Sequence, residues 1–257
     1  MKVKEIFCNT FKAISERLYQ ESFVLYHPNS WVNRSLSLDS QFCRALFNNG
    51  YLTFEQMLYA TCRYRLGASK NGGVIFWQID HEGRIHDGKI MYYNPDCHRN
   101  KKHDPTWVSY FLAKREGKTK DQYTTTHCLF GLHQIRGEGL VVRGERITVA
   151  IVEAEKTAVI LSELYPQYIW LAAGGLGELQ INKFRPLRGR KVVLFPDTDP
   201  EGKTFASWHR RAQEVMAEPF WEDSPPIRVS PVLELHATEE QKQRKIDLID
   251  YIFEGRD

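Results

Sequence analysis

Acidic residues stand directly after two apolar segments in the second half of this chain. Glu153 follows the run 148–152, and Asp197 and Asp199 follow the run 192–195 with one residue between them. Magnesium is a hard cation that binds carboxylate oxygens, keeps several waters and is commonly completed by phosphate oxygens. A cation held in this way neutralises phosphate charge and positions an attacking or leaving oxygen. These acids therefore predict a Mg²⁺ or Mn²⁺ centre that handles nucleic acid or nucleotides.

The segments around these acids switch between the periods of strands and helices. Apolar runs predict strands at 147–152, 168–172, 191–195 and 227–233, and helical patterns lie at 156–165, 203–216 and 239–253. Short apolar strands separated by helices predict an α/β fold with a mainly parallel sheet flanked by helices. Ligands of such sheets bind at the carboxyl ends of the strands. The predicted acidic centre lies at that edge.

Two further points qualify the acidic set. Asp199 taken alone can equally be read as the N-cap of the helix that follows it. The last predicted helix contains Asp247 and Asp250, which add carboxylates near the same edge.

The first half of the chain has a different organisation. We expect mostly helix up to residue 64, broken by a turn-rich stretch at 27–34, with N-caps at Asp39 and Thr53. Residues 73–80 and 84–93 predict paired strands, and 94–126 a polar, basic loop. The predicted domains are a helical region at 1–62, a smaller α+β basic subdomain at 63–144 and the α/β domain at 145–257.

Composition limits the class of protein. With 42% hydrophobic and 26% charged residues, the chain is an ordinary globular sequence, which disfavours disorder and a coiled coil. No apolar run reaches the roughly 20 residues of a membrane helix, and no secretory signal begins the sequence. We therefore expect a cytoplasmic protein with no membrane partner.

Basic residues gather in the predicted loop, although the net charge is only +3. They are Arg99, Lys101, Lys102, Lys114, Arg115, Lys118 and Lys120. Such a run could contact phosphates or form a solvated loop. The nearby Cys97-His98 and His127-Cys128 pairs fit no common zinc spacing, so we predict no zinc site.

Three segments of the C-terminal half carry a family resemblance. Residues 149–158 read Val-Ala-Ile-Val-Glu-Ala-Glu-Lys-Thr-Ala, residues 170–175 read Trp-Leu-Ala-Ala-Gly-Gly, and residues 192–203 read Val-Val-Leu-Phe-Pro-Asp-Thr-Asp-Pro-Glu-Gly-Lys. This series resembles the Toprim domain of bacterial and phage DNA primases. The resemblance implies metal ligation by Glu153, Asp197 and Asp199, with Asp250 in the late acidic element of primase-like members.

Upstream motifs extend the resemblance. Residues 64–67 (Tyr-Arg-Leu-Gly), the strand pair with Gly88-Lys89, and residues 128–133 (Cys-Leu-Phe-Gly-Leu-His) resemble the basic subdomain that precedes Toprim in primases. The likeness implies that a set of cations faces template or nucleotide phosphates: Arg63, Arg65, Lys89, Arg99, Lys101 and Lys102. The overall order also resembles primase-like proteins of mobile elements in Bacteroides-type bacteria.

The chain departs from the family pattern in three ways. Ala154 and Thr157 replace the glycine and the aspartate that usually follow the first glutamate. No zinc-binding cysteine pattern is present, which puts autonomous priming in doubt. No phosphate-binding P-loop is present either, which excludes an intrinsic helicase.

The predicted function is a primase-like nucleotidyltransferase. It would bind single-stranded DNA and nucleoside triphosphates, and its catalytic residues would be Glu153, Asp197, Asp199 and Lys89. Two alternatives stay open: a Toprim-type nuclease with the same metal centre, and a non-catalytic nucleic-acid-binding factor that works beside a separate helicase or relaxase of a mobile element.

Overall fold

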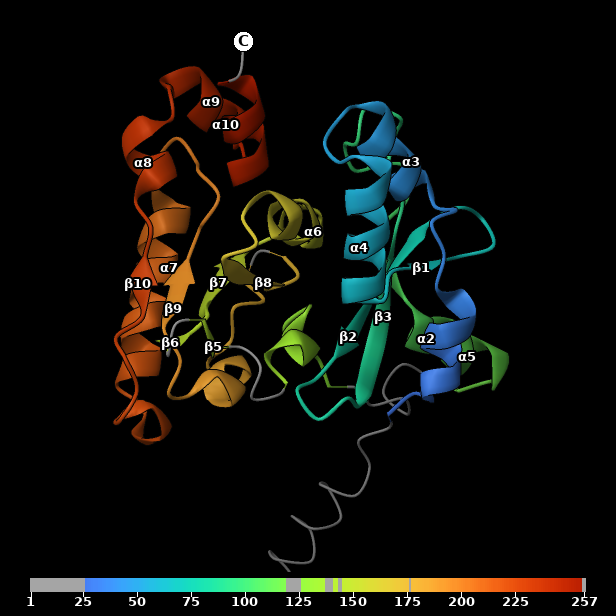
Figure 1. Ribbon diagram of the computed structural model, residues 1–257, viewed down its shortest axis with the longest axis horizontal. Coiled ribbons are helices and arrows are strands. Elements are labelled where there is room, and N and C mark those ends of the chain that lie inside the picture. The colour runs from blue at the N-terminus through green and yellow to red at the C-terminus, as the bar shows by residue number, and fades with distance from the viewer. Residues whose placement is uncertain (1–25, 119–125, 137–140, 143–144, 176, 256–257) are drawn as a thin grey trace, which may run out of the picture.

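A computed structural model describes residues 26–118, 126–136, 141–142, 145–175 and 177–255 of the chain. Predictions for residues 1–25, for Lys120 and for a boundary at 144 lie outside these residues. Two four-stranded sheets organise the molecule, one antiparallel with the order β1-β2-β3-β4 and one parallel with the order β10-β9-β7-β8. They lie side by side in Figure 1, with helices α4 and α6 next to each other at their junction.

The antiparallel unit precedes the parallel one in sequence. Its elements are α2 (Asn29–Ser35), α3 (Gln41–Asn48), α4 (Phe54–Tyr64), β1 (Gly67–Ala68), β2 (Val74–Ile79), β3 (Ile85–Met91), β4 (Thr106–Trp107) and α5 (Val108–Arg115). The predicted strand pair is confirmed, since β2 and β3 pair antiparallel along their length. The predicted N-cap at Thr53 is also confirmed, because Thr53 and Gln56 form a capping box at the start of α4.

Three predictions for this unit are wrong. Helix α2 occupies most of the stretch 27–34 that was expected to be a break, and β4 with α5 lies inside the expected loop 94–126. The N-cap of α3 is Ser40 rather than Asp39, because the Ser40 hydroxyl accepts the N–H of Cys43 at 3.1 Å. The side chain of Asp39 instead pairs with Arg44 on the surface at 2.7 Å.

The parallel unit follows the predicted α/β order. Its elements are β7 (Thr148–Val152), α6 (Glu155–Leu164), β8 (Tyr168–Ala172), the 3-10 helix η3 (Ile181–Leu187), β9 (Val192–Leu194), α7 (Lys203–Met216), the 3-10 helix η4 (Pro219–Trp221), β10 (Arg228–Val229), α8 (Val232–His236), α9 (Glu239–Arg244) and α10 (Leu248–Glu254). Strand β7 pairs in parallel with both β8 and β9, and β9 pairs in parallel with β10. The predicted fold class is confirmed: the sheet is parallel and helices flank it (Figure 1).

Two elements near the C-terminus differ from prediction. The expected strand at 227–233 contains only the two residues of β10 before α8 begins. The expected helix at 239–253 is divided into α9 and α10, because Lys245 adopts a left-handed conformation with φ of 57°. Asp247 then caps α10 by accepting the N–H groups of Ile249 and Asp250. This interruption turns Asp247 toward the edge of the sheet.

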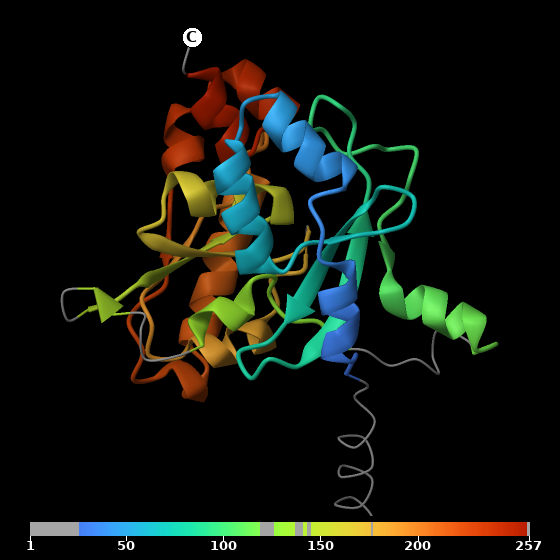
Figure 2. The same ribbon diagram turned by 45° about the vertical axis from the view of Figure 1, so that its right-hand side comes forward.

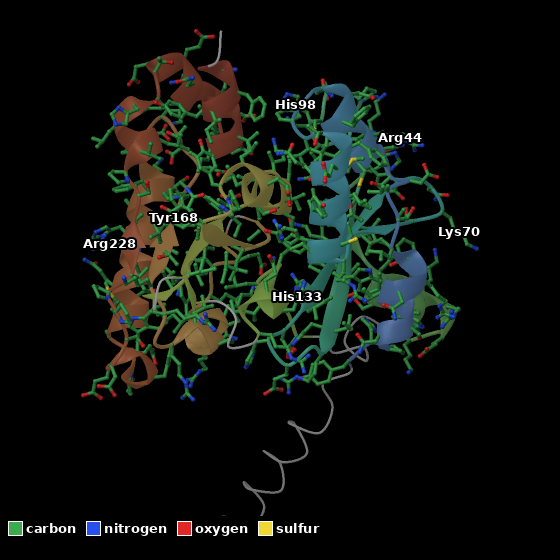
Figure 3. All side chains as sticks on the ribbon, in the orientation of Figure 1. Arg44, Lys70, His98, His133, Tyr168 and Arg228 are labelled. Carbon is green, nitrogen blue, oxygen red and sulfur yellow. The ribbon has the colours of Figure 1, made fainter. Side chains whose placement is uncertain are left out.

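A segment between the two units joins their cores. This segment contains Phe130, whose backbone bridges to Ala172 of β8, and the 3-10 helix η2 (Leu132–Ile135). The buried Tyr64 of α4 places its hydroxyl 3.1 Å from the Ala158 carbonyl and 2.8 Å from the Trp170 carbonyl. His133 also lies at this junction (Figure 3), where its Nε2 is 2.8 Å from the Arg63 carbonyl. The two sheets are therefore held by contacts between buried groups.

A two-stranded ribbon of β5 (Val141–Val142) and β6 (Glu145–Arg146) leads into β7. No described helix is both long enough and apolar enough to span a bilayer.

Candidate metal centre

The order of the parallel strands creates a topological switch point. From β7 the chain passes through α6 to β8 on one side, whereas β9 and β10 lie on the other side of β7. Connections that leave two adjacent strands in opposite directions open a crevice at their carboxyl ends, where ligands of α/β sheets bind. Glu153 directly follows β7, and Asp197 follows β9. The topology therefore brings these two predicted ligands to one crevice.

Glu153 and Asp197 are carboxylates whose charge the fold does not balance. Burial raises the pKa of Asp197 well above its usual range, and the carboxylates of Asp247 and Glu153 raise it further, against the lowering influence of the Lys156 ammonium. Burial also raises the pKa of Glu153, against the lowering influence of the Lys89 ammonium. Among the described residues, no side chain forms a salt bridge with either carboxylate. Both groups are thus held close to like charges in a poorly solvated position.

Lys156, in the first turn of α6, lies beside this pair. Its ammonium is 3.3 Å from Asp247 and 3.8 Å from Asp250. Burial acts to lower the Lys156 pKa, but the two aspartates outweigh it and hold the pKa above its usual value. The hydroxyl of Thr157 donates to Asp247 at 2.8 Å. Asp247 is thereby neutralised from within the chain, and its pKa is lowered although burial alone would raise it.

Asp250 belongs to the same cluster. Burial and the neighbouring Asp247 raise its pKa, and its Oδ2 accepts the backbone N–H of Asp247 at 3.2 Å. Its carboxylate also lies at the edge of the Lys156 ammonium. Asp250 is therefore near the predicted centre, although one of its carboxylate oxygens already accepts a hydrogen bond at the start of α10.

The structure gives Asp199 a different position from Asp197. Its Oδ1 accepts the N–H groups of Glu201 and Lys203, each at 3.1 Å, and its Oδ2 accepts the N–H of Thr204 at 2.6 Å. Burial acts to raise the Asp199 pKa, but these hydrogen bonds lower it to about 2. The carboxylate thus caps α7, whose own N-cap is a glycine. Of the two readings of Asp199 from sequence, the geometry favours the cap.

Lys89 lies across the junction rather than in an open cleft. The buried ammonium donates to Glu155 Oε1 at 3.0 Å, to Glu155 Oε2 at 3.2 Å and to the Gly174 carbonyl at 2.6 Å. A lysine ammonium has three donors, so this arrangement uses all of them. The geometry supports a link between β3 and the start of α6, and it leaves no donor for a phosphate.

The other predicted phosphate contacts divide into two groups. Arg63 donates to the Ser162 carbonyl at 3.0 Å and pairs with Glu163 at 2.8 Å, and Arg65 donates to Asn33. These two arginines tie helices together. The exposed members are Arg99, Lys101 and Lys102, and Arg99 is 3.8 Å from Asp104.

The donor chemistry of the crevice suits a hard cation, although the side chains do not form a complete cage. Within the described part of the chain, no three His, Cys, Asp or Glu side chains converge enough to hold a metal alone. Mg²⁺ usually takes one or two protein carboxylates and completes its shell with water and phosphate oxygens. Glu153 and Asp197 fit that requirement, and a bound cation would relieve the repulsion that raises their pKa values.

Sequence reasoning missed Lys156 and left Asp247 out of the ligand set. One local signal was available for the lysine. A cation in the first turn of a helix is unfavourable against the helix dipole, so Lys156 at the second residue of α6 indicates an anionic partner. The partner itself is supplied from about ninety residues away by the interrupted C-terminal helix.

Residues 40–198 match the family described as Domain of unknown function (DUF6371). No curated protein matched the chain. Among solved structures, one titled as the DnaG primase catalytic domain bound to ssDNA is 14% identical with a TM-score of 0.49, covering 88% of this chain and 82% of that one.

Two further structures have the same character. The E. coli primase catalytic core is 14% identical with a TM-score of 0.48, covering 88% of this chain and 81% of its own. The primase fragment of the bacteriophage T7 primase-helicase is 16% identical with a TM-score of 0.39, covering 73% and 68%. Scores and identities of this size describe a similar arrangement of elements and imply no shared chemistry.

Proposed function

The chain belongs to the DUF6371 family, and for this member we propose a metal-dependent nucleotidyltransferase of the Toprim type that synthesises primers on single-stranded DNA. The observation that carries the proposal is a pair of half-buried carboxylates at the switch point of the parallel sheet, Glu153 and Asp197, whose pKa values are raised by desolvation and by neighbouring carboxylates. Strongly perturbed carboxyl groups at such a crevice are typical of functional sites. Nucleoside triphosphates and a single-stranded template are the proposed substrates.

The proposed cofactor is Mg²⁺ or Mn²⁺, held by Glu153 and Asp197 with Asp250 beside them. When bound there, it supplies neutralisation of phosphate charge and orientation of an oxygen nucleophile. Phosphoryl transfer depends almost entirely on such positioning and electrostatic stabilisation. Glu153 and Asp197 would hold the cation through carboxylate oxygens that form no salt bridge with any described side chain.

Other residues of the chain hold this centre in place. Lys156 pairs with Asp247 and lies beside Asp250, and this ammonium forms no salt bridge with Glu153 or Asp197 within the described residues. Asp199 fixes the loop that carries Asp197 by capping α7. The backbone N–H of Thr198 donates to the Ile246 carbonyl at 3.2 Å, which ties the same loop to the α10 side. These are positioning roles.

Lys89 is also assigned a positioning role in this proposal. By bonding Glu155 and the Gly174 carbonyl, it fixes the residues on either side of Glu153. Template phosphates would meet the exposed Arg99, Lys101 and Lys102, and a separate helicase or relaxase of a mobile element would supply the single strand.

The experiment is incorporation of labelled nucleotides on single-stranded DNA with Mg²⁺ or Mn²⁺. Wild type is compared with Glu153→Gln and Asp197→Asn, and the exposed Asp223→Asn is the matched control. We expect metal-dependent products that fall at least a hundredfold in the first two variants and persist in the control. Degradation of the template would instead assign a nuclease, and an intact template with no product would remove the catalytic proposal.

Metal binding to the same variants can be measured without any reaction. Calorimetric titration with Mn²⁺ should give binding in wild type and in Asp223→Asn, and none in the variant that carries both Glu153→Gln and Asp197→Asn. Binding that survives the double substitution would contradict the assignment of the metal ligands.

A further inference from the structure

Helix α5 presents an unusual outer face. Tyr110 is 54% exposed and Phe111 is 50% exposed, and their rings contact each other with centroids 5.6 Å apart. Lys114 and Arg115 follow them by four residues and are exposed as well. Residues four apart lie on the same side of a helix, so each exposed aromatic ring has a cation as its neighbour.

The exposure of these rings does not come from a loose helix. The backbone N–H of Ser109 donates to the buried Asp87 at 3.1 Å, and the Ser109 hydroxyl donates to the same carboxylate. Leu112 and Ala113 are buried on the opposite side of α5. Helix α5 therefore has one buried apolar face, and the Tyr110–Phe111 pair lies on its exposed face. Figure 2 shows α5, in green, extending outward beside the antiparallel sheet.

The charged residues on this face of α5 are basic. The first turn of α5 has no acidic residue, and its last turn carries Lys114 and Arg115. The first acid after the helix, Glu116, pairs with Lys118 at 2.7 Å. A partner must therefore offer negative charge together with flat apolar surfaces. Single-stranded nucleic acid has this chemistry, because its phosphates contact cations while its bases stack on aromatic rings.

Helix α4 provides an internal contrast. It also exposes aromatic rings, Phe54 at 58% and Tyr59 at 54%. Its exposed acid is Glu55, which accepts the Tyr59 hydroxyl at 3.0 Å, and its Arg63 is paired with Glu163. Helix α3 exposes one ring, Phe47 at 50%, and its exposed cation Arg44 is paired with Asp39 at 2.7 Å. Among the described helices, α5 is the one that places two exposed rings beside two exposed cations.

The position of α5 relates it to the candidate metal centre. Strand β4 ends at Trp107, which pairs with Lys89 of β3, and α5 begins at the next residue. Lys89 in turn contacts Glu155 and Gly174 beside Glu153. Through β4, β3 and Lys89, α5 is therefore connected to the residues beside Glu153.

We propose that the Tyr110–Phe111–Lys114–Arg115 face of α5 is a stacking surface for single-stranded nucleic acid. The choice of nucleic acid rests on the proposed function, whereas the location rests on exposure and charge. The rings stack on bases without sequence preference, and the two cations lie beside the phosphates of the same strand.

The test is binding of a labelled oligothymidylate by fluorescence anisotropy in the absence of divalent metal. The variant with Tyr110→Ala and Phe111→Ala should bind at least tenfold more weakly, since stacking is worth about 1–3 kcal/mol per base. The slope of log affinity against log salt should stay unchanged in this variant. The variant with Lys114→Gln and Arg115→Gln should instead reduce that slope by about 1.4, for two phosphate contacts on a single strand.

The matched control carries Phe54→Ala and Tyr59→Ala on α4 and should bind like wild type. Equal weakening by the control, or wild-type binding by the α5 aromatic variant, overturns the proposal. Loss of a self-associated species in the α5 variant, with DNA binding unchanged, overturns it in favour of contact between copies of the chain.

The two proposals fail separately in this design. Normal oligonucleotide binding through α5 by a chain that incorporates no nucleotide contradicts the nucleotidyltransferase and leaves the surface intact. Incorporation by a chain whose α5 aromatic variant binds normally contradicts the surface alone.

Discussion

Carboxylates of the antiparallel unit receive hydrogen bonds that Glu153 and Asp197, at the edge of the parallel sheet, lack among the described residues. In the antiparallel unit, burial acts to raise the pKa of Asp80, yet bonds from His86, Arg84 and Glu82 lower it to about 2. The pKa of Asp87 is lowered in the same way, by His27, Ser109 and Gly88. At the edge of the parallel sheet, the ammonium groups of Lys89 and Lys156 offset desolvation only in part, and the pKa values of Glu153 and Asp197 are raised.

The difference shows that burial alone does not identify a functional acid. A carboxylate is a candidate functional group when the fold supplies it with no hydrogen-bond donors. A hairpin turn brings N–H groups and a following arginine onto Asp80 at 2.7–2.9 Å. A switch point separates two strand ends and gives their side chains no such donors. The contrast recurs over two residues, because Asp199 receives three N–H groups of the α7 start while Asp197 faces other carboxylates. Unbalanced charge therefore distinguishes the candidate site from the structural acids.

The largest effect should come from breaking a balanced buried pair. Lys89→Met leaves the Glu155 carboxylate buried without its cation, which should lower the free energy of unfolding by about 3–5 kcal/mol. Adding Glu155→Gln removes the uncompensated charge and should restore most of that loss. Urea unfolding of the two variants and wild type measures both. A loss below about 1 kcal/mol in the single variant would mean that the pair is solvated.

A smaller loss is expected where an acid serves only as a cap. Asp199→Ala removes the acceptor for three backbone N–H groups at the start of α7, and the free energy of unfolding should fall by about 2 kcal/mol. The exposed neighbour Glu201→Ala is the control and should change stability by less than about 0.5 kcal/mol. Chemical denaturation gives both values. An unchanged stability in Asp199→Ala would break the distinction between Asp197 and Asp199.

Asp197→Asn should act in the opposite direction. Without metal it removes a carboxylate that other carboxylates repel, so the free energy of unfolding should rise. Saturating Mg²⁺ should stabilise wild type, by about 2.7 kcal/mol at a hundred times the dissociation constant, and leave the variant unchanged. Thermal unfolding with and without Mg²⁺ tests this, with the exposed Asp223→Asn as control. Destabilisation of the metal-free Asp197→Asn would refute the unbalanced site.

The smallest effect is a pair of opposite pH dependences. Asp197 holds its proton more tightly in the folded chain, so its contribution to stability falls as pH rises above the usual value near 3.8. The stability gained by Asp197→Asn should therefore widen between about pH 4 and pH 7. The contribution of Asp80 is present above 3.8 and is lost as pH falls toward 2. The deficit of Asp80→Asn should shrink in that lower window, and urea midpoints across pH check both signs. Parallel behaviour of the two variants would remove the contrast.

The sequence by itself determined the order of elements around the parallel sheet and the position of its acids. Strand and helix periods are local properties, so β7, α6, β8, β9 and α7 were found within one or two residues of their bounds. Because a parallel sheet places ligands at the carboxyl ends of its strands, Glu153 and Asp197 could be assigned to one edge without coordinates. The N-cap at Thr53 was readable for the same local reason.

Only the tertiary structure decided which charged groups have partners. Lys89 meets Glu155 across 66 positions of sequence, and Lys156 meets Asp247 only because Lys245 interrupts the expected helix. Whether Asp199 faces a metal or a helix start depends on the path of the loop that follows it. Local patterns set periods and caps, whereas the balance of a buried charge depends on residues that folding brings together from distant segments. That balance separates Glu153 and Asp197 from Asp80 and Asp199, whose pKa values are lowered.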